Sequence, residues 1–244
     1  MRDFLVSLLN GLLLAGLGAA ATKGYEAWKR HRENGHLYSL LPKKGRVQIV
    51  VPGFDVKDFI PLGSTERAIV PPNLRAMPMA EGGAIAQVVT MLNSLGRLDP
   101  ELVAPDAFQD NCPLTISFGG PSVNPISGNL LHTYFPSFTI KYPEHIASYG
   151  STTYEPARAA DGSLVEDYGF IASATAETGR RRYLVLCGVW SMGTQIATDA
   201  LLDLPRGSEV RGDLQGGTAF LAVAHGTVHG LSHGNVRIES VRHS

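Results

Sequence analysis

An uncharged apolar run near the amino terminus constrains this chain more than any later motif. The run extends from Phe4 to Thr22, and four cationic residues follow within ten positions: Lys23, Lys29, Arg30 and Arg32. Its nineteen residues would span about 28 Å as a helix, which matches the hydrocarbon core of a bilayer. The sequence therefore predicts a transmembrane anchor over residues 1–22.

Charge next to this run predicts which side of the membrane the rest of the chain occupies. Positions 23 to 46 carry seven Lys or Arg against two acids, whereas positions 1 to 3 carry one charge of each sign. Basic flanks remain in the cytoplasm. We therefore expect a single-pass protein of the cell inner membrane, with a basic juxtamembrane linker over residues 23–45 and a cytoplasmic α/β ligand-binding domain over residues 46–244.

A cleaved secretory signal is the alternative interpretation of the same segment, because residues 17–21 supply small side chains for a signal peptidase. The cationic cluster after the run favours an uncleaved anchor. Gly11, Ala15 and Ala19 recur at four-residue spacing, which lets helices approach closely in lipid. We expect a homo-oligomer on this ground, against the plainer reading that small residues are common in membrane helices.

The composition beyond the anchor is that of one soluble domain. A formal net charge of −1 argues against direct nucleic-acid binding. The two cysteines, Cys112 and Cys187, are too few for a disulfide framework. Cys187 lies in an apolar run, where it reads as a small buried hydrophobe.

Strand-like and helical patterns alternate along this domain, which predicts an α/β fold of three layers with a mostly parallel sheet, and hairpin-like segments predict an antiparallel edge. The expected strands cover 46–52, 114–118, 138–142, 168–174, 183–189, 220–224 and 236–241. The expected helices end near Gly96, Thr133 and Leu204. The proline-rich stretch from Gly53 to Met79 has little periodicity and is expected to be a lid or binding loop, or else a disordered insertion.

Two turns from strand to helix are the first candidates for a ligand site. One contains Gly119, Gly120, Ser122 and Asn124, and the other contains Gly188, Ser191, Gly193 and Thr194. Glycines allow close approach to the backbone, and the helix that follows each turn presents free amides to an anion. We predict that these eight residues border one pocket for a phosphorylated small molecule, with Ser122 or Asn124 as an alternative helix cap.

The second turn also allows a catalytic interpretation. Ser191 stands where a hydrolase nucleophile would follow a strand, and Gly193 provides one small neighbour. Val189 crowds the position where such an elbow has glycine. Asp213 with His225, His229 or His233 would have to complete the triad. The alternative is that Ser191 caps the helix that follows.

His225, His229 and His233 recur every fourth residue near the carboxyl terminus. Three histidines on one face are able to hold zinc. A glycine directly follows each of the three histidines. This pattern favours a glycine-rich surface turn with solvated imidazoles over a metal site.

The order of these motifs resembles the Rossmann-like sensor domains of bacterial defence and nucleotide-signalling systems. The similarity covers about residues 46–225 and rests on Gly119, Gly120, Pro121, Asn124, Asp167, Tyr168, Gly169, Gly188, Gly193 and Thr194. It implies nucleotide-binding and signalling through the membrane helix, in antiviral defence. The chain lacks both Gly-x-Gly-x-x-Gly and a phosphate-loop lysine, which leaves the ligand open. A membrane-anchored serine hydrolase using Ser191, and a tethered protein-interaction module without a ligand, are the alternatives.

Overall fold

A mixed seven-stranded sheet forms the centre of the domain in the computed structural model, which describes residues 41, 45–55, 75–94, 98–204, 208–216 and 219–243. The strand order is β12-β11-β9-β10-β5-β1-β4. In chain order these strands are β1 (Gly45–Val50), β4 (Leu98–Val103), β5 (Leu114–Phe118), β9 (Glu166–Thr175), β10 (Arg182–Gly188), β11 (Phe220–His229) and β12 (Ser232–His243).

The sheet has a parallel half and an antiparallel half. Strands β4, β1, β5 and β10 are parallel neighbours, whereas β9, β11 and β12 each run antiparallel to the strand beside them. The expectation of a mostly parallel sheet therefore needs correction. Short connections join β9 to β10 and β11 to β12, and such connections join antiparallel strands.

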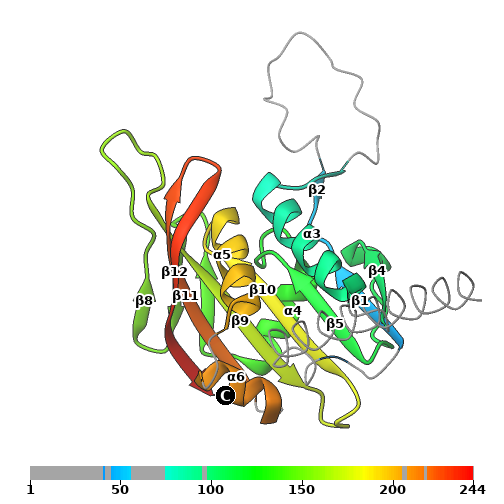
Figure 1. Cartoon of the computed structure of the whole chain (residues 1–244). Helices are drawn as coiled ribbons and strands as arrows, with labels where there is room; N and C mark the ends of the chain where they lie inside the picture. The colour runs from blue at the N-terminus through cyan, green and yellow to red at the C-terminus, as the bar shows by residue number, and fades with distance from the viewer. Residues whose placement is uncertain are drawn as a thin grey trace, which may run out of the picture.

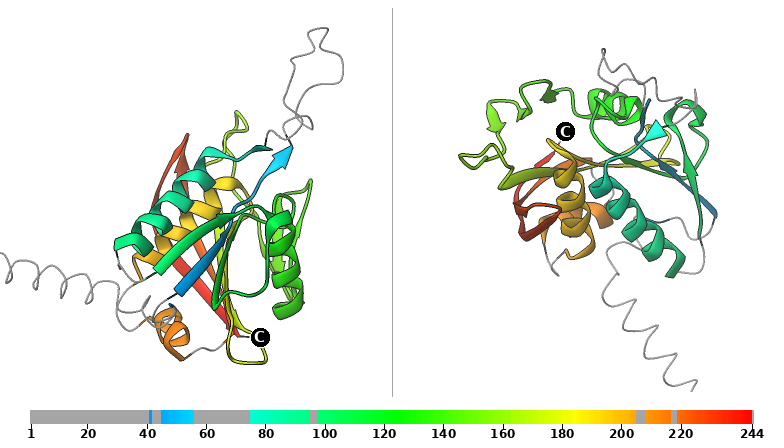
Figure 2. Two further views of the ribbon diagram at one scale, coloured as in Figure 1. Left: turned by 90° about the vertical axis from the view of Figure 1, so that its right-hand side faces the viewer. Right: turned by 90° about the horizontal axis from the view of Figure 1, so that it is seen from above.

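Helices cover both faces of this sheet. Helices α3 (Met79–Ser94) and α5 (Ser191–Leu202) lie side by side on one face, as Figure 1 shows. Helix α4 (Pro125–Tyr134) lies on the opposite face (Figure 2). The short helix α6 (Glu209–Gly216) packs near the end of the sheet, where its Val210 and Leu214 join the core under α3 and α5.

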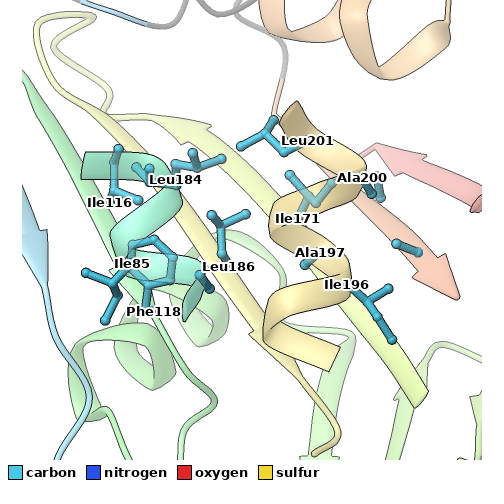
Figure 3. Close-up of a cluster of buried hydrophobic side chains, with 14 of the residues drawn as sticks. Ile85, Ile116, Phe118, Ile171, Leu184, Leu186, Ile196, Ala197, Ala200 and Leu201 are labelled. Carbon is cyan, nitrogen blue, oxygen red and sulfur yellow. The ribbon is translucent and has the colours of Figure 1, made fainter. Parts of the chain in front are cut away.

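The core is divided by the sheet because successive strand residues point to opposite faces. In β10, Leu184 and Leu186 pack beneath α3 and α5, while Val185 and Cys187 face α4. Figure 3 shows the hydrophobic cluster between the sheet and helices α3 and α5, with Ile196 of α5 approaching the sheet. The buried position predicted for Cys187 is confirmed.

Two smaller sheets accompany the central sheet in the described residues. One packs on the α4 side and consists of β6 (Phe138–Lys141), β7 (Ile146–Tyr149) and β8 (Thr152–Tyr154). The other is a two-strand ribbon of β2 (Phe54–Asp55) and β3 (Arg75–Ala76). A 3-10 turn, η2, covers Pro105–Ala107. The predicted binding loop from Gly53 to Met79 thus begins and ends in described structure, and its residues 56–74 lie outside the described residues.

Several elements differ from their predicted limits. The sequence did not predict β4, which contains Pro100 and two acids; it lies at the sheet edge, where a proline is tolerated. Helix α5 begins at Ser191, whereas the sequence pattern predicts a start near Thr194. Trp190 occupies its N-cap position without a side-chain cap bond. Ser191 is therefore not the cap of this helix.

The predictions for residues 1–22 and for most of the basic linker lie outside the described residues. Within the part of the chain that the structure describes, no helix combines the length and the apolar character needed to cross a bilayer.

Helix α5 crosses the sheet in direct backbone contact. A Cβ atom on Gly193 would lie 2.1 Å from the carbonyl oxygen of Tyr168, and one on Gly188 would lie 2.5 Å from Gly193 Cα. A Cβ on Gly169 of β9 would lie 2.2 Å from the Gly193 carbonyl oxygen. These three glycines let the helix approach closer than any side chain would permit.

We predict that Gly193→Ala destabilises the domain by about 3 kcal/mol or more, because the clashing atoms belong to backbone that cannot rotate away. The matched control is Gly212→Ala in α6, where a Cβ would meet nothing within 4 Å. Alanine there should be neutral or stabilising by up to about 1 kcal/mol. Urea denaturation of both variants measures the difference, and equal stabilities would contradict the proposed close crossing.

Candidate functional site

The two glycine turns predicted from the sequence lie together at one edge of the sheet. They follow β5 and β10, which are parallel neighbours, so both leave the sheet at its carboxyl edge. The Gly119 amide donates to the Leu186 carbonyl at 2.9 Å, and a Cβ on Gly120 would lie 3.6 Å from the Gly188 carbonyl oxygen. The structure therefore brings the two turns into contact.

This edge is also a topological switch point. The chain leaves β1 towards α3 on one face and leaves the adjacent β5 towards α4 on the other face. Ligands of open α/β sheets bind at such divergence points. The candidate site lies at the carboxyl ends of β1, β5 and β10.

Asn124 has a structural role in the first turn. Its side-chain oxygen accepts from the amides of Ile126 and Ser127, which caps α4, and its side-chain NH₂ group donates to Ser117 Oγ and the Phe118 carbonyl. Asn124 is fully buried, and these four bonds use its whole hydrogen-bonding capacity. The predicted capping role is confirmed, and the side chain has no group left for a ligand.

Asp167 occupies the amino end of α5 in the second turn. Its carboxylate oxygens accept from Gly193 N at 2.6 Å, Tyr168 N at 2.8 Å and Trp190 N at 3.3 Å. Burial raises the pKa of this carboxyl to about 7, although the three amide donors offset part of the rise. The amides that the sequence assigned to a phosphate are thus bound by a carboxylate of the protein.

Tyr142 closes the gap above the first turn. A Cβ on Gly120 would lie 2.7 Å from the Tyr142 hydroxyl, so only glycine fits beneath it. Burial raises the pKa of Tyr142 to about 12, and a hydrogen bond with the exposed Ser122 offsets part of this rise. Ser122 therefore lies at the outer rim of the site, and Gly120 lies inside it.

Glu81 is the most unusual group at this edge. It lies in the first turn of α3 and is 3% exposed, and its Oε1 would be 3.3 Å from a Cβ on Gly119. Its Oε2 and the Oγ1 of the neighbouring Thr194 are buried and make no hydrogen bond of normal geometry. Burial raises the pKa of the Glu81 carboxyl to about 7, and a weak hydrogen bond from the Thr194 hydroxyl offsets part of the rise. Buried polar groups without well-formed hydrogen bonds are rare and often functional.

A cavity of about 390 Å³ opens at the carboxyl ends of β1 and β4, and Glu81 is not among the residues that line it. Pro52 and Met77 line it together with Val51, Gly53, Leu102, Val103 and Ala104. Pro52 would contact a Cβ on Gly119, and Met77 Cε would lie 3.3 Å from one on Gly82. Both residues therefore separate the cavity from the glycines and helix turn that adjoin Glu81.

An aromatic and cationic stack lies on the opposite side of the second turn. The His145 ring stacks on Trp190 with centroids 3.6 Å apart, and the Arg158 guanidinium lies 4.6 Å from the same indole centroid. Burial and the charge of Arg158 lower the pKa of His145. Arg158 also lowers the pKa of Asp167 by its charge. This stack places the positive charge of Arg158 close enough to act on the Asp167 carboxyl.

The groups needed for serine catalysis lie apart. Asp213 Oδ2 bonds His243 Nε2 at 3.0 Å, and His233 Nε2 bonds Asp199 Oδ2 at 2.5 Å. Within the described residues, positive φ at non-glycine positions occurs at His145 and Asn235. Ser191 therefore lacks the strained conformation of a nucleophile elbow.

The three spaced histidines lie in a β-hairpin rather than in a surface turn, which corrects that expectation. His225 is buried in β11 and lies 3.4 Å from Glu166, His229 ends the same strand exposed, and His233 lies in β12 beside Asp199. Their separate partners give no shared metal geometry. A different histidine, His243, has its ligand atom within 4.8 Å of those of Glu209 and Asp213.

Comparisons with known proteins add no relative to this picture: no protein-family model, no curated protein and no solved structure matches the chain.

Glu81 should make the stability of the domain depend on pH. Below pH 4.5 both the folded and the unfolded state hold its proton. Between pH 4.5 and about 7 only the folded state keeps it, so the free energy of unfolding falls. Above pH 7 the loss is complete and amounts to about 3 kcal/mol at most.

Glu81→Gln should remove this dependence. We expect the variant to match the wild type near pH 4.5 and to exceed its stability at pH 8, as measured by urea denaturation. Asp167 titrates in both proteins, so its contribution cancels. Glu155→Gln is the control, because Glu155 is exposed and the same change there should leave both values unaltered. A Glu81→Gln effect that is identical at the two pH values would refute the raised pKa.

Proposed function

We propose that this chain is a membrane-tethered sensor. Its Rossmann-like, three-layer cytoplasmic domain binds a nucleotide-derived small molecule at the carboxyl edge of the parallel strands. The anchor over residues 1–22 holds the domain at the bacterial inner membrane as a homo-oligomer, and ligand binding changes the state of that assembly. Antiviral defence is the setting that the motif resemblance suggests for such a signal.

The observation that carries this proposal is the buried carboxyl of Glu81. Burying such a group costs stability, and the hydroxyl of Thr194 beside it offsets only part of the resulting pKa rise. A cost of this kind is offset when a ligand supplies further hydrogen bonds.

The position of these groups supports ligand binding as well. They lie at a divergence of strand connections, beside a cavity of about 390 Å³. That volume is within the range of small-molecule sites. The side chains that line the cavity are apolar, as is most of the lining of small-molecule sites.

Binding, rather than catalysis, fits the chemistry of the edge. A hydrolase requires a nucleophile within reach of a base, and two groups considered for Ser191, Asp213 and His233, bond other side chains. A sensor requires only that its ligand make different contacts in the two assembly states, since equal binding to both shifts nothing.

Isolation of the full chain from cell membranes, followed by mass spectrometry of the small molecules that it releases, tests both parts of the proposal. We expect the chain in the membrane fraction and a nucleotide-derived compound in near-stoichiometric amount. Glu81→Gln should abolish co-purification, and Glu155→Gln should preserve it. Recovery in the soluble fraction would contradict the anchor. A wild-type protein that releases no small molecule, and whose melting temperature no nucleotide changes, would favour the interaction module instead.

A further inference from the structure

The turn between β6 and β7, residues 142–145, lies against both glycine turns of the candidate site, and we call it the strap. A Cβ on Gly120 would lie 2.7 Å from the hydroxyl of Tyr142 and 3.6 Å from the carbonyl oxygen of Gly188. The Tyr142 hydroxyl also makes a hydrogen bond with Ser122 of the first glycine turn. The first residue of the strap therefore occupies the switch point of the sheet, where open α/β sheets bind their ligands.

The last residue of the strap, His145, covers the second glycine turn. Its imidazole stacks on the indole of Trp190, with ring centroids 3.6 Å apart and 22° between the ring planes. Tyr142 contacts the same imidazole edge to face, with centroids 5.6 Å apart. The two aromatic side chains of the strap thus fill this edge of the sheet together.

The strap has the features of a segment that is able to leave its place. Pro143 and Glu144 at its tip are exposed, and Tyr142 and His145 are only partly buried. His145 has a φ of 54°, in the left-handed region that is unfavourable for a residue with a side chain. Its Nδ1 is buried without a hydrogen bond, which is also unfavourable. Both features lower the free energy needed to displace the imidazole.

The surface beneath His145 has the chemistry that binds a nucleobase. An imidazole is a flat heteroaromatic ring, as a nucleobase is, and either one is able to stack on an indole. The guanidinium of Arg158 lies 4.6 Å from the centroid of the Trp190 ring, and Arg158 is exposed. Because Asp167 already occupies the amides at the start of α5, this cation is the better partner for phosphates next to a stacked base.

Building on the proposed function, we infer that the strap is an internal competitor of the ligand, and that a nucleobase of the ligand stacks on Trp190 in the place of His145. The strap and the base cannot occupy the indole together. Ligand binding is therefore linked to displacement of the strap, which gives the domain the two states with different ligand contacts that a sensor requires.

Isothermal titration of the full chain in detergent with AMP, GMP, cyclic di-AMP, cyclic di-GMP and ribose 5-phosphate, which has no base, tests this inference. We expect His145→Ala to tighten the best nucleotide at least about fivefold, because the competing stack is lost. Tyr142→Phe, which removes only the hydroxyl, should tighten it about threefold. The affinity for ribose 5-phosphate should not change. His229→Ala, which removes an exposed imidazole outside the site, should leave every affinity unaltered.

The opposite results separate two failures. Equal or weaker nucleotide binding by His145→Ala would overturn the competition and leave the sensor proposal standing, and equal tightening of ribose 5-phosphate would overturn the stacked base. If neither the wild type nor His145→Ala bound a nucleotide, the nucleotide proposal and this inference would fail together. A nucleotide that binds only to His145→Ala would support the inference, since the wild type would then be held closed. Thermal melting checks that each variant is folded, and Tyr142→Phe decides the question if His145→Ala is not.

Discussion

The contact of α5 with the strands β9 and β10 determines the rest of this structure. Gly169, Gly188 and Gly193 bring two backbones together where any Cβ would clash, and the Asp167 carboxylate bonds the helix amides exposed by that approach. Helix α3 then packs against α5, which places Glu81 beside Thr194. The same crossing therefore sets both the core packing and the polar groups of the candidate site.

A consequence is that the helix dipoles at this edge are already compensated. Asn124 and Asp167 satisfy the amino ends of α4 and α5, so these helices stabilise the fold instead of holding an anion. The candidate interacting group at this edge is therefore Glu81 of the neighbouring helix α3, and not either helix end. Two carboxyls whose pKa values burial raises to about 7 give the site a charge that changes near neutral pH.

Much of this fold could be predicted because its elements carry strong local signals. The β-branched runs gave β1, β5 and β10, whereas the edge strand β4 contains Pro100 and lacked such a pattern. The glycine turns were found, but the groups that fill them were not, because Asp167 reaches the second turn from a separate strand. Glu81 had a usable signal: it precedes Ile85 and Val88 by four and seven residues, so it falls on the buried stripe of α3.

The claim on which the proposed site depends is that burial holds the pKa of the Glu81 carboxyl near 7. Carbon-13 NMR of protein labelled at the glutamate side-chain carboxyl, with the Glu81 signal assigned by its absence from Glu81→Gln, measures its titration directly. We expect a midpoint near pH 7 in the free protein and a lower one when a bound hydrogen-bond donor stabilises the carboxylate. A midpoint near 4.5, the ordinary value for this group, would contradict the account.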